Sequence, residues 1–226
     1  MRTRFLALSF SSPASTDDTA DKILLLGGSG FVGSEIARQA RARSGVKCIA
    51  LSSADFDLTA PNAQERVAQA AQGCVVVIST VGSMTGTEQD LSVNAATAAA
   101  TKGAKQAGVP RFVAIGNSQR VRRLSHSVPF LQNCAAGKEE SEKVIRELFG
   151  FQGCIVQPTF IYGGDEFGLS PPRVASSVGK VVEELETLST PSLVSGIARY
   201  CWGHSRTTDI GRKCGGRLSQ CSLRIL

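Results

Sequence analysis

The sequence predicts an α/β fold built on a doubly wound parallel sheet, with residues 21–163 forming its main domain. Short apolar runs alternate with amphipathic or alanine-rich segments along this part of the chain. The apolar runs are continuous, which is typical of strands buried on both faces. A glycine-rich turn, "GGSGFVG", follows the first run. Strands that alternate with helices imply parallel pairing through right-handed crossovers.

The first half of the domain shows three strands and two helices. "KILLLG" is the first strand, and the following helix carries Val32, Ile36 and Ala40 at four-residue spacing. Pro61 suits the first turn of the second helix. In order, the predicted elements are a strand at 22–27, a helix at 31–43, a strand at 46–51, a helix from about 61 to 72 and a strand at 74–80.

The second half continues the alternation. Alanine, the best helix former, dominates the next helix, which Gly108 and Pro110 end. The segment "RVRRLSHSVPF" is interpreted as a basic loop. The predicted elements are a helix at 94–107, strands at 111–116 and 153–158, and a helix at 138–149, with two further helices expected at 174–188 and 191–202.

The glycine turn is a candidate phosphate-binding loop. Gly27, Gly30 and Gly33 follow a strand and open a helix, which is the context that such a site requires. Gly27 permits the tight turn, Gly30 admits the backbone close to a diphosphate, and Gly33 lets the helix pack near the sheet. The helix N-terminus would offer amides and a positive dipole end to the anion. The alternative is a glycine turn without a ligand.

This loop and the motifs after it resemble the short-chain dehydrogenase/reductase superfamily, and most closely its extended and atypical members. The matching stretches are "GGSGFVG", "FDLTAP", "STVG", "AGVPRFVAIGNS" and "QPTFIYG", within residues 22–163. The group nearest in pattern is related to a complex I accessory subunit and to proteins of quinone biosynthesis. The resemblance implies a Rossmann-like fold and an NAD or NADP cofactor.

The resemblance also implies which residues bind the dinucleotide. Asp57 and Leu58 would hold the adenine ring, although Asp57 also suits a plain turn before a helix. The loop after "CVVVIST" would pass beneath the cofactor, and "QPTFIYG" would lie near the nicotinamide, with Gln157 in place of arginine. The expected cofactor residues are Gly27, Ser29, Gly30, Phe31, Val32, Asp57, Leu58, Thr80, Val81, Gly82, Lys138 and Pro158.

The superfamily's catalytic pair is Y-x-x-x-K, and this chain departs from it. The matching segment is "CAAGK", so Lys138 is present but Cys134 stands at the tyrosine position. Lys138 would anchor the nicotinamide ribose and shift a nearby thiol toward thiolate. Ser118 would orient a substrate oxygen. The structural alternatives are a small packed residue for Cys134, a surface lysine for Lys138 and a helix cap for Ser118.

Three features bear on the cofactor's identity and on the substrate. Arg120, Arg122 and Arg123 would be either solvated charges or attractors of an anion, including the extra phosphate of NADP. His126 is interpreted as an exposed residue of the same loop. The second strand ends in "ALSSAD" without an immediate acid for a ribose 2′-hydroxyl, which tilts the expectation toward NADP or no strict preference.

The two ends of the chain differ from the middle. Residues 1–16 carry a charge of +2 and residues 203–226 a charge of +4, so the segment between them is neutral and nucleic-acid binding is disfavoured. Residues 1–20 resemble a mitochondrial or plastid transit peptide or a disordered start, with a cytoplasmic protein as the alternative. Residues 164–202 form a short substrate region that is incomplete for this superfamily, and residues 203–226 are expected to be disordered.

The seven cysteines are odd in number and irregular in spacing, which favours free thiols in a reducing compartment. No paired C-x-x-C occurs, so no metal site is expected. No apolar run reaches the roughly 20 residues of a membrane span. The sequence therefore predicts an NAD(P)-binding protein that is either an organellar oxidoreductase or isomerase, acting on a small lipophilic or quinone-type substrate, or a non-catalytic scaffold of a protein complex.

Overall fold

The computed structural model describes residues 20–158, 160–162 and 187–189. The predictions for residues 1–19, for most of 164–202 and for 203–226 lie outside these ranges. The described elements are β1 (Asp21–Leu26), α1 (Phe31–Arg41), β2 (Val46–Leu51), α2 (Ala63–Ala70), β3 (Cys74–Ser79), α3 (Gln89–Gln106), β4 (Phe112–Ile115), α4 (Gln119–Ser125), α5 (Pro129–Phe149), the 3₁₀ turn η1 (Gly150–Gln152), β5 (Gly153–Val156), β6 (Phe160–Tyr162) and β7 (Thr187–Ser189).

Five parallel strands form the central sheet in the order β2-β1-β3-β4-β5, which confirms the doubly wound, Rossmann-like fold. The chain runs from β1 outward to β2, then returns past β1 to β3 and continues in the opposite direction. Such a reversal leaves a crevice at the carboxyl ends of β1 and β3, where ligands of open α/β sheets bind. A separate two-stranded parallel pair joins β6 and β7.

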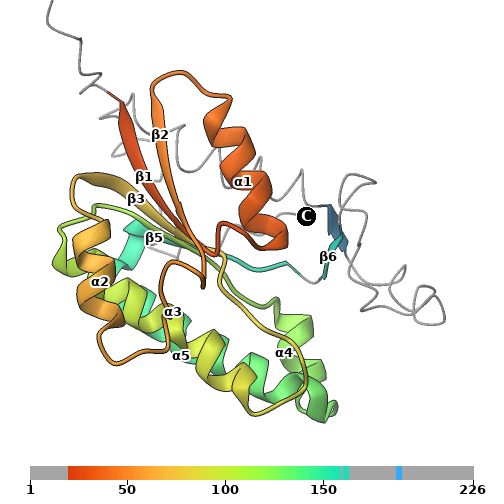
Figure 1. Ribbon diagram of the computed structural model, residues 1–226. Coiled ribbons are helices and arrows are strands. Elements are labelled where there is room, and N and C mark those ends of the chain that lie inside the picture. Colours follow the sequence, from red (N-terminus) through yellow and green to blue (C-terminus); the bar gives the residue numbers. More distant parts are fainter. Residues whose placement is uncertain (1–19, 159, 163–186, 190–226) are drawn as a thin grey trace, which may run out of the picture.

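The sheet is covered on both faces (Figure 1). Ile23 and Leu25 of β1 point toward α1, whose Val32, Ile36 and Ala40 complete that core. The alternate residues of β1 pack with α2, α3 and α5 on the other face. Residues 23–26 are all 0% exposed, so the continuous apolar run belongs to a strand buried on both sides, as predicted.

Two helices begin earlier in the chain than the sequence predicts. Helix α3 starts at Gln89, because the Asp90 carboxylate accepts the amides of Thr85 and Gly86 and so closes the turn before it. Helix α5 starts at Pro129, since proline lacks the amide that a first helical residue would leave unpaired.

Three further expectations are corrected. The predicted basic loop contains helix α4, which Ser118 caps by accepting the amide of Val121 at 3.3 Å. Pro61 stands before α2 rather than in its first turn, which begins at Ala63. The expected helix at 174–188 is wrong at its described end, where β7 begins at Thr187.

Candidate functional site

The glycine loop is fixed to the ends of two strands. Gly27 has φ of +82°, and a Cβ atom there would lie 2.7 Å from Thr80 Oγ1. The amides of Gly27 and Gly28 both donate to the carbonyl of Leu51 at 2.9 Å. A Cβ atom on Gly33 would lie 2.0 Å from the carbonyl oxygen of Gly27, so α1 touches the loop at a distance that only glycine allows.

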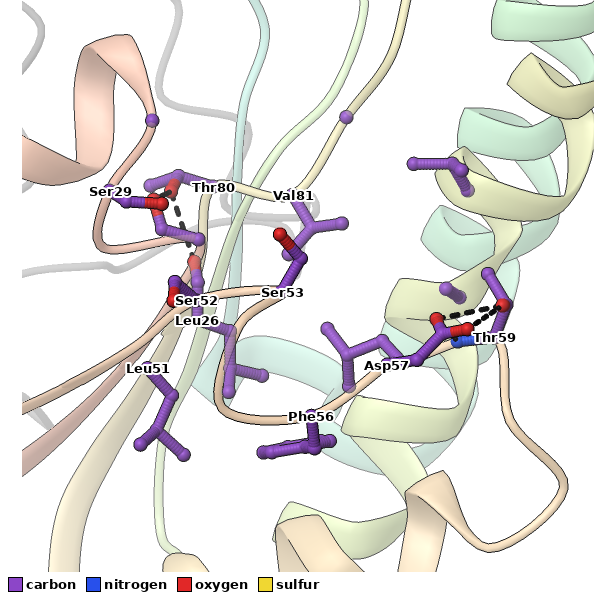
Figure 2. Close-up of a pocket in the computed structure, with 16 residues that line it drawn as sticks. Leu26, Ser29, Leu51, Ser52, Ser53, Phe56, Asp57, Thr59, Thr80 and Val81 are labelled. Atoms are coloured by element: carbon purple, nitrogen blue, oxygen red, sulfur yellow. Dashed lines mark hydrogen bonds between the residues drawn. The ribbon is translucent and has the colours of Figure 1, made fainter.

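The start of α1 faces an open cavity. Gly30 is the N-cap residue, and as a glycine it has no side chain that could cap this helix end. The cavity beside it has a volume of about 290 Å³ (Figure 2). It is lined by Leu26, Gly27, Ser29, Gly30, Leu51, Ser52, Ser53, Phe56, Asp57, Leu58, Thr59, Thr80, Val81, Gly82, Val93 and Ala96.

Eight of the predicted cofactor residues line this cavity: Gly27, Ser29, Gly30, Asp57, Leu58, Thr80, Val81 and Gly82. The other four, Phe31, Val32, Lys138 and Pro158, are not among its described lining residues. Val32 instead packs in the core beneath α1, where it is 8% exposed. The cofactor roles of all twelve residues stay predictions.

Thr80 joins the loop after β3 to the glycine loop. Its hydroxyl donates to the carbonyls of Leu26 at 3.0 Å and Gly27 at 3.2 Å, and its amide donates to Leu26 as well. Figure 2 shows Thr80 close to Ser29 at one end of the cavity. The threonine therefore fixes the switch point of the sheet, where β1 and β3 end side by side.

Asp57 lies at the opposite end of the cavity (Figure 2). Its carboxylate accepts the Thr59 amide at 2.8 Å and the Thr59 hydroxyl at 2.7 Å. These hydrogen bonds, the backbone one first, lower the pKa of Asp57. Leu58 and Phe56 give this end an apolar surface suited to a flat ring, and the Arg66 guanidinium stacks over the Phe56 ring at 4.4 Å.

Lys138 is a buried cation that lies against two residues of the cavity wall, Val81 and Gly82, so the surface-lysine alternative is wrong. It is 8% exposed, and its Nζ donates to the carbonyl of Val81 at 2.7 Å. A Cβ atom on Gly82 would lie 3.0 Å from the same Nζ. Burial lowers the pKa of Lys138 from 10.5 to about 8, and the charges of Cys134 and Glu142 oppose that shift.

Cys134 lies one helical turn before Lys138 and is also buried, at 8% exposure. Burial raises the pKa of its thiol, and this effect exceeds the lowering caused by Lys138. Lys138 thus acts on the thiol in the expected direction, but burial outweighs it. Among the described cysteines, residues 48, 74 and 134 are free thiols, and burial also raises the pKa of Cys48 and Cys74.

Ser118 stands at the end of β4 and carries the structural role of a cap for α4. Its amide donates to the carbonyl of Pro158 at 3.2 Å, which brings together the two segments that follow β4 and β5. Neighbouring Asn117 has a buried Nδ2, and its side chain lowers the pKa of the Cys134 thiol. The polar atoms at this end of the sheet thus gather near α5, which carries Cys134 and Lys138.

Glu142 was not identified from the sequence. Its carboxylate binds three side chains of this region. It is 2% exposed, and its carboxylate accepts Arg122 of α4, Arg146 at 2.7 Å and Gln157 at 3.1 Å. Arg122 is therefore part of a buried ion pair and not a solvated or anion-attracting charge. The arginine expected from family pattern at position 157 is replaced by a neutral glutamine, while Arg122 supplies a guanidinium from another element.

Comparison with known proteins identifies the family. A family described as NAD(P)H-binding matches residues 27–180, which is more than half of the chain. The chain belongs to the NAD(P)H-binding family. The start of the match coincides with Gly27, the first glycine of the phosphate loop.

Relatives of this NAD(P)H-binding chain are distant. An uncharacterized chloroplastic protein of Arabidopsis thaliana is 26% identical over 203 residues, which span 81% of this chain and 67% of that protein. The dTDP-4-dehydrorhamnose reductase of Bacillus anthracis, solved with NADP, aligns with a TM-score of 0.61 at 14% identity over 80% of this chain and 71% of its own. The dTDP-glucose 4,6-dehydratase of Streptomyces venezuelae, solved with NAD, gives 0.57 at 16% identity over 80% and 72%.

The NAD(P)H-binding chain thus takes a nicotinamide dinucleotide as its cofactor, and the two solved structures share its fold. The residues present fit that group, because glycine alone fits at Gly27 and Gly33 and the N-cap residue Gly30 has no side chain. No helix in the described part of the chain is long and apolar enough to cross a bilayer.

Eight lining residues of the cavity were not predicted: Leu26, Leu51, Ser52, Ser53, Phe56, Thr59, Val93 and Ala96. Four of them follow β2, whose carboxyl end lies next to the glycine loop through Leu51. These four could have been predicted from the sequence, because ligands bind beyond the carboxyl ends of parallel strands. Val93 and Ala96 lie in the first turns of α3, which the sequence placed too late.

Proposed function

We propose that this protein is an NAD(P)-dependent oxidoreductase in which Lys138 serves as the proton donor in place of the missing tyrosine. The observation that supports this proposal is the position of the Lys138 Nζ, buried 2.7 Å from the carbonyl of Val81 at the cavity wall. An amine with a pKa of about 8 gives and takes a proton readily near neutral pH.

The bound dinucleotide would supply a hydride acceptor or donor for the interconversion of an alcohol and a carbonyl compound. The glycine loop and the N-terminus of α1 would hold its diphosphate, and Asp57 and Leu58 would flank its adenine. Lys138 would give its proton to the developing alkoxide oxygen and regain one from solvent. Ser118 would orient the same oxygen through its hydroxyl hydrogen, since its oxygen already accepts the Val121 amide.

Cys134 has no proton-transfer role in this proposal. Its thiol is buried and its pKa is raised, so it stays neutral and packs as a small residue of α5. Replacing it by alanine is therefore expected to leave turnover within about twofold, the ordinary effect of a volume change that spares the reacting groups.

The test is NADH and NADPH oxidation with a panel of aldehydes, ketones and quinones. Lys138→Met should lower kcat by a factor of about 10² or more, the usual contribution of a general acid. Cys134→Ala is the matched control, one turn away on the same helix face. Equal kcat values for Lys138→Met and the unmodified protein would refute Lys138 as the proton donor.

The second candidate is a non-catalytic, dinucleotide-binding scaffold or assembly factor. It is favoured by one observation: a buried neutral thiol occupies the position of the catalytic phenol. If the panel yields no turnover while dinucleotide binding is intact, the scaffold function replaces the enzyme. Turnover gained in Cys134→Tyr would then identify it as a decayed enzyme.

We also propose a plastid location and a quinone-type substrate. The location is supported by the acid-free, arginine- and serine-bearing residues 1–16 and by the name of the Arabidopsis relative. Expression of the full chain with a C-terminal fluorescent protein tests it. Plastid fluorescence supports the proposal, whereas mitochondrial or cytoplasmic fluorescence overturns it.

A further inference from the structure

Most of the exposed large apolar side chains in the described part of the chain gather at one corner of the domain. Five such side chains are more than a third exposed there: Leu91, Leu124, Val128, Phe130 and Phe151. The first four, called the apolar corner below, come from the start of α3, the end of α4 and the start of α5, which lie together in Figure 1. Single exposed apolar residues are ordinary, but four on adjoining segments are typical of an interaction surface.

Backbone and ring contacts hold these segments against one another. The Val128 amide donates to the Leu124 carbonyl at 2.9 Å, which joins the end of α4 to the start of α5. A Cβ atom on Gly86 would lie 2.3 Å from the Phe130 ring, so this ring covers the loop before α3. Leu91 follows five residues after Gly86, in the first turn of α3. The apolar corner is therefore built on a defined backbone.

The surface beside the apolar corner is basic. From residue 119 to residue 137 the chain carries three arginines and one histidine and no acid. Arg122 is paired with the buried Glu142, whereas Arg120, Arg123 and the histidine are exposed. The end of α4 therefore presents positive charge next to Leu124.

The segments packed around α4 add little negative charge to this surface. In residues 82–91 the acids are Glu88 and Asp90. Asp90 is 0% exposed, and its carboxylate accepts two loop amides and the Ser83 hydroxyl, so Glu88 is the exposed acid of this segment. On α5 the first acid, Glu139, lies nine residues beyond Phe130, about 14 Å along the helix.

The apolar corner is connected to the candidate site along α5. Phe130 and Lys138 are eight residues apart, which is about 12 Å along the helix. The loop after β3 follows the same side of α5, because Gly82 lies against the Lys138 Nζ and Gly86 lies beneath the Phe130 ring. A lipid-sized molecule held at the apolar corner would therefore extend as far as Lys138.

We propose that the apolar corner binds a membrane surface that contains anionic lipids. Its apolar side chains would enter the boundary between headgroups and acyl chains, and the arginines beside them would pair with lipid phosphates. A partner protein fits less well, since a specific interface buries about 800 Å² on each partner. Four side chains that are each less than half exposed offer much less apolar area.

This inference goes beyond the proposed redox function, and its test needs neither a dinucleotide nor a substrate. The full chain is mixed with vesicles of phosphatidylcholine, with or without phosphatidylglycerol, and the bound fraction is measured by flotation. Binding to the anionic vesicles should be at least about fivefold tighter at low salt, the contribution of one arginine near an anionic surface. The difference should shrink at about 1 M salt, where the screening length is about 3 Å.

Variants of exposed residues separate the apolar and the charged contributions. Leu124→Ser combined with Val128→Ser should weaken binding to both kinds of vesicle by about tenfold, because less apolar surface leaves water. Arg123→Glu should weaken binding to the anionic vesicles alone, by about fivefold or more. The matched controls are Phe151→Ser, at a residue that is 78% exposed outside the apolar corner, and Lys47→Glu on β2, and neither should change binding.

Three results would overturn the proposal. The first is a full chain that does not bind the anionic vesicles. The second is equal binding by the full chain and by corner variants that are folded by circular dichroism, because the membrane contact would then lie elsewhere in the chain. The third is a dimer of the full chain that becomes a monomer in the double variant on gel filtration, because the corner would then join two copies. Vesicle binding without dinucleotide binding would sink the proposed function and leave this inference standing.

Discussion

At the scale of single residues, both the candidate site and the fold depend on Gly33, because this residue has no Cβ atom. A Cβ atom there would lie 2.0 Å from the Gly27 carbonyl oxygen and 2.8 Å from Thr80 Oγ1, so the loop backbone must move. Gly33→Ala should lower the free energy of unfolding by about 1–3 kcal/mol and weaken dinucleotide binding at least about tenfold. Urea denaturation and isothermal titration measure the two effects.

A helical glycine away from the cavity provides the control for Gly33. A Cβ atom on Gly103 would lie 2.4 Å from the carbonyl oxygen of Gln64, at the contact of α3 with α2. Gly103→Ala should therefore reduce stability to a similar degree while the folded protein still binds the dinucleotide. An unchanged dissociation constant in Gly33→Ala would show that the loop geometry does not control binding.

Lys138 makes the stability of the protein rise with pH, whereas a lysine in an ordinary ion pair makes it fall. Its pKa falls from 10.5 to about 8 on folding, so between these values the unfolded state binds more protons. The amine is charged in both states below pH 8 and neutral in both above pH 10.5, and stability should rise between them by up to about 3 kcal/mol. Urea denaturation of Lys138→Met removes this rise and isolates it from the other titrating groups. Identical pH slopes for the two proteins would contradict a buried amine.

At the scale of elements, Glu142 ties α5 to α4 and to the segment after β5. Its carboxylate is 2% exposed, whereas Arg122 and Arg146 are 26% and 35% exposed. Breaking a fully buried ion pair costs roughly 3–5 kcal/mol, and partial exposure of both arginines reduces that figure, so Glu142→Gln should cost about 2 kcal/mol. Thermal or urea unfolding measures this cost.

Glu140→Gln serves as the comparison for Glu142→Gln, since it removes a carboxylate from the exposed face of the same helix. It should change stability by less than about 0.5 kcal/mol. Equal losses in the two variants would mean that the buried pairing of α4 with α5 contributes nothing. Because α4 borders the segment with Ser118, the Glu142 variant should also show faster amide exchange at residues 117–125.

At the scale of the whole molecule, the sequence predicted what depends on local pattern. The strands around Leu24 and Val77 and the glycine loop were visible because burial on both faces and a strand–turn–helix context leave a local signature. The ion pair of Glu142 with Arg122 was not visible, since it joins side chains that are distant in sequence. The raised pKa of Cys134 depends on burial, which no spacing reveals.

Dinucleotide binding should stabilise the described domain as a unit, because the cavity is built from the ends of β1, β2 and β3 and the start of α3. At a hundred times its dissociation constant, a ligand that binds only the folded state adds about 2.7 kcal/mol. For a chain of this size each kcal/mol raises Tm by roughly 2–4 °C, so NADH should raise Tm by about 5–10 °C. Differential scanning calorimetry of the full chain gives the value. The rise should fall to about half or less in Gly33→Ala at the same NADH concentration, because a tenfold weaker affinity leaves only about 1.4 kcal/mol of added stability. A rise of equal size in both proteins would place the bound nucleotide elsewhere than at the glycine loop.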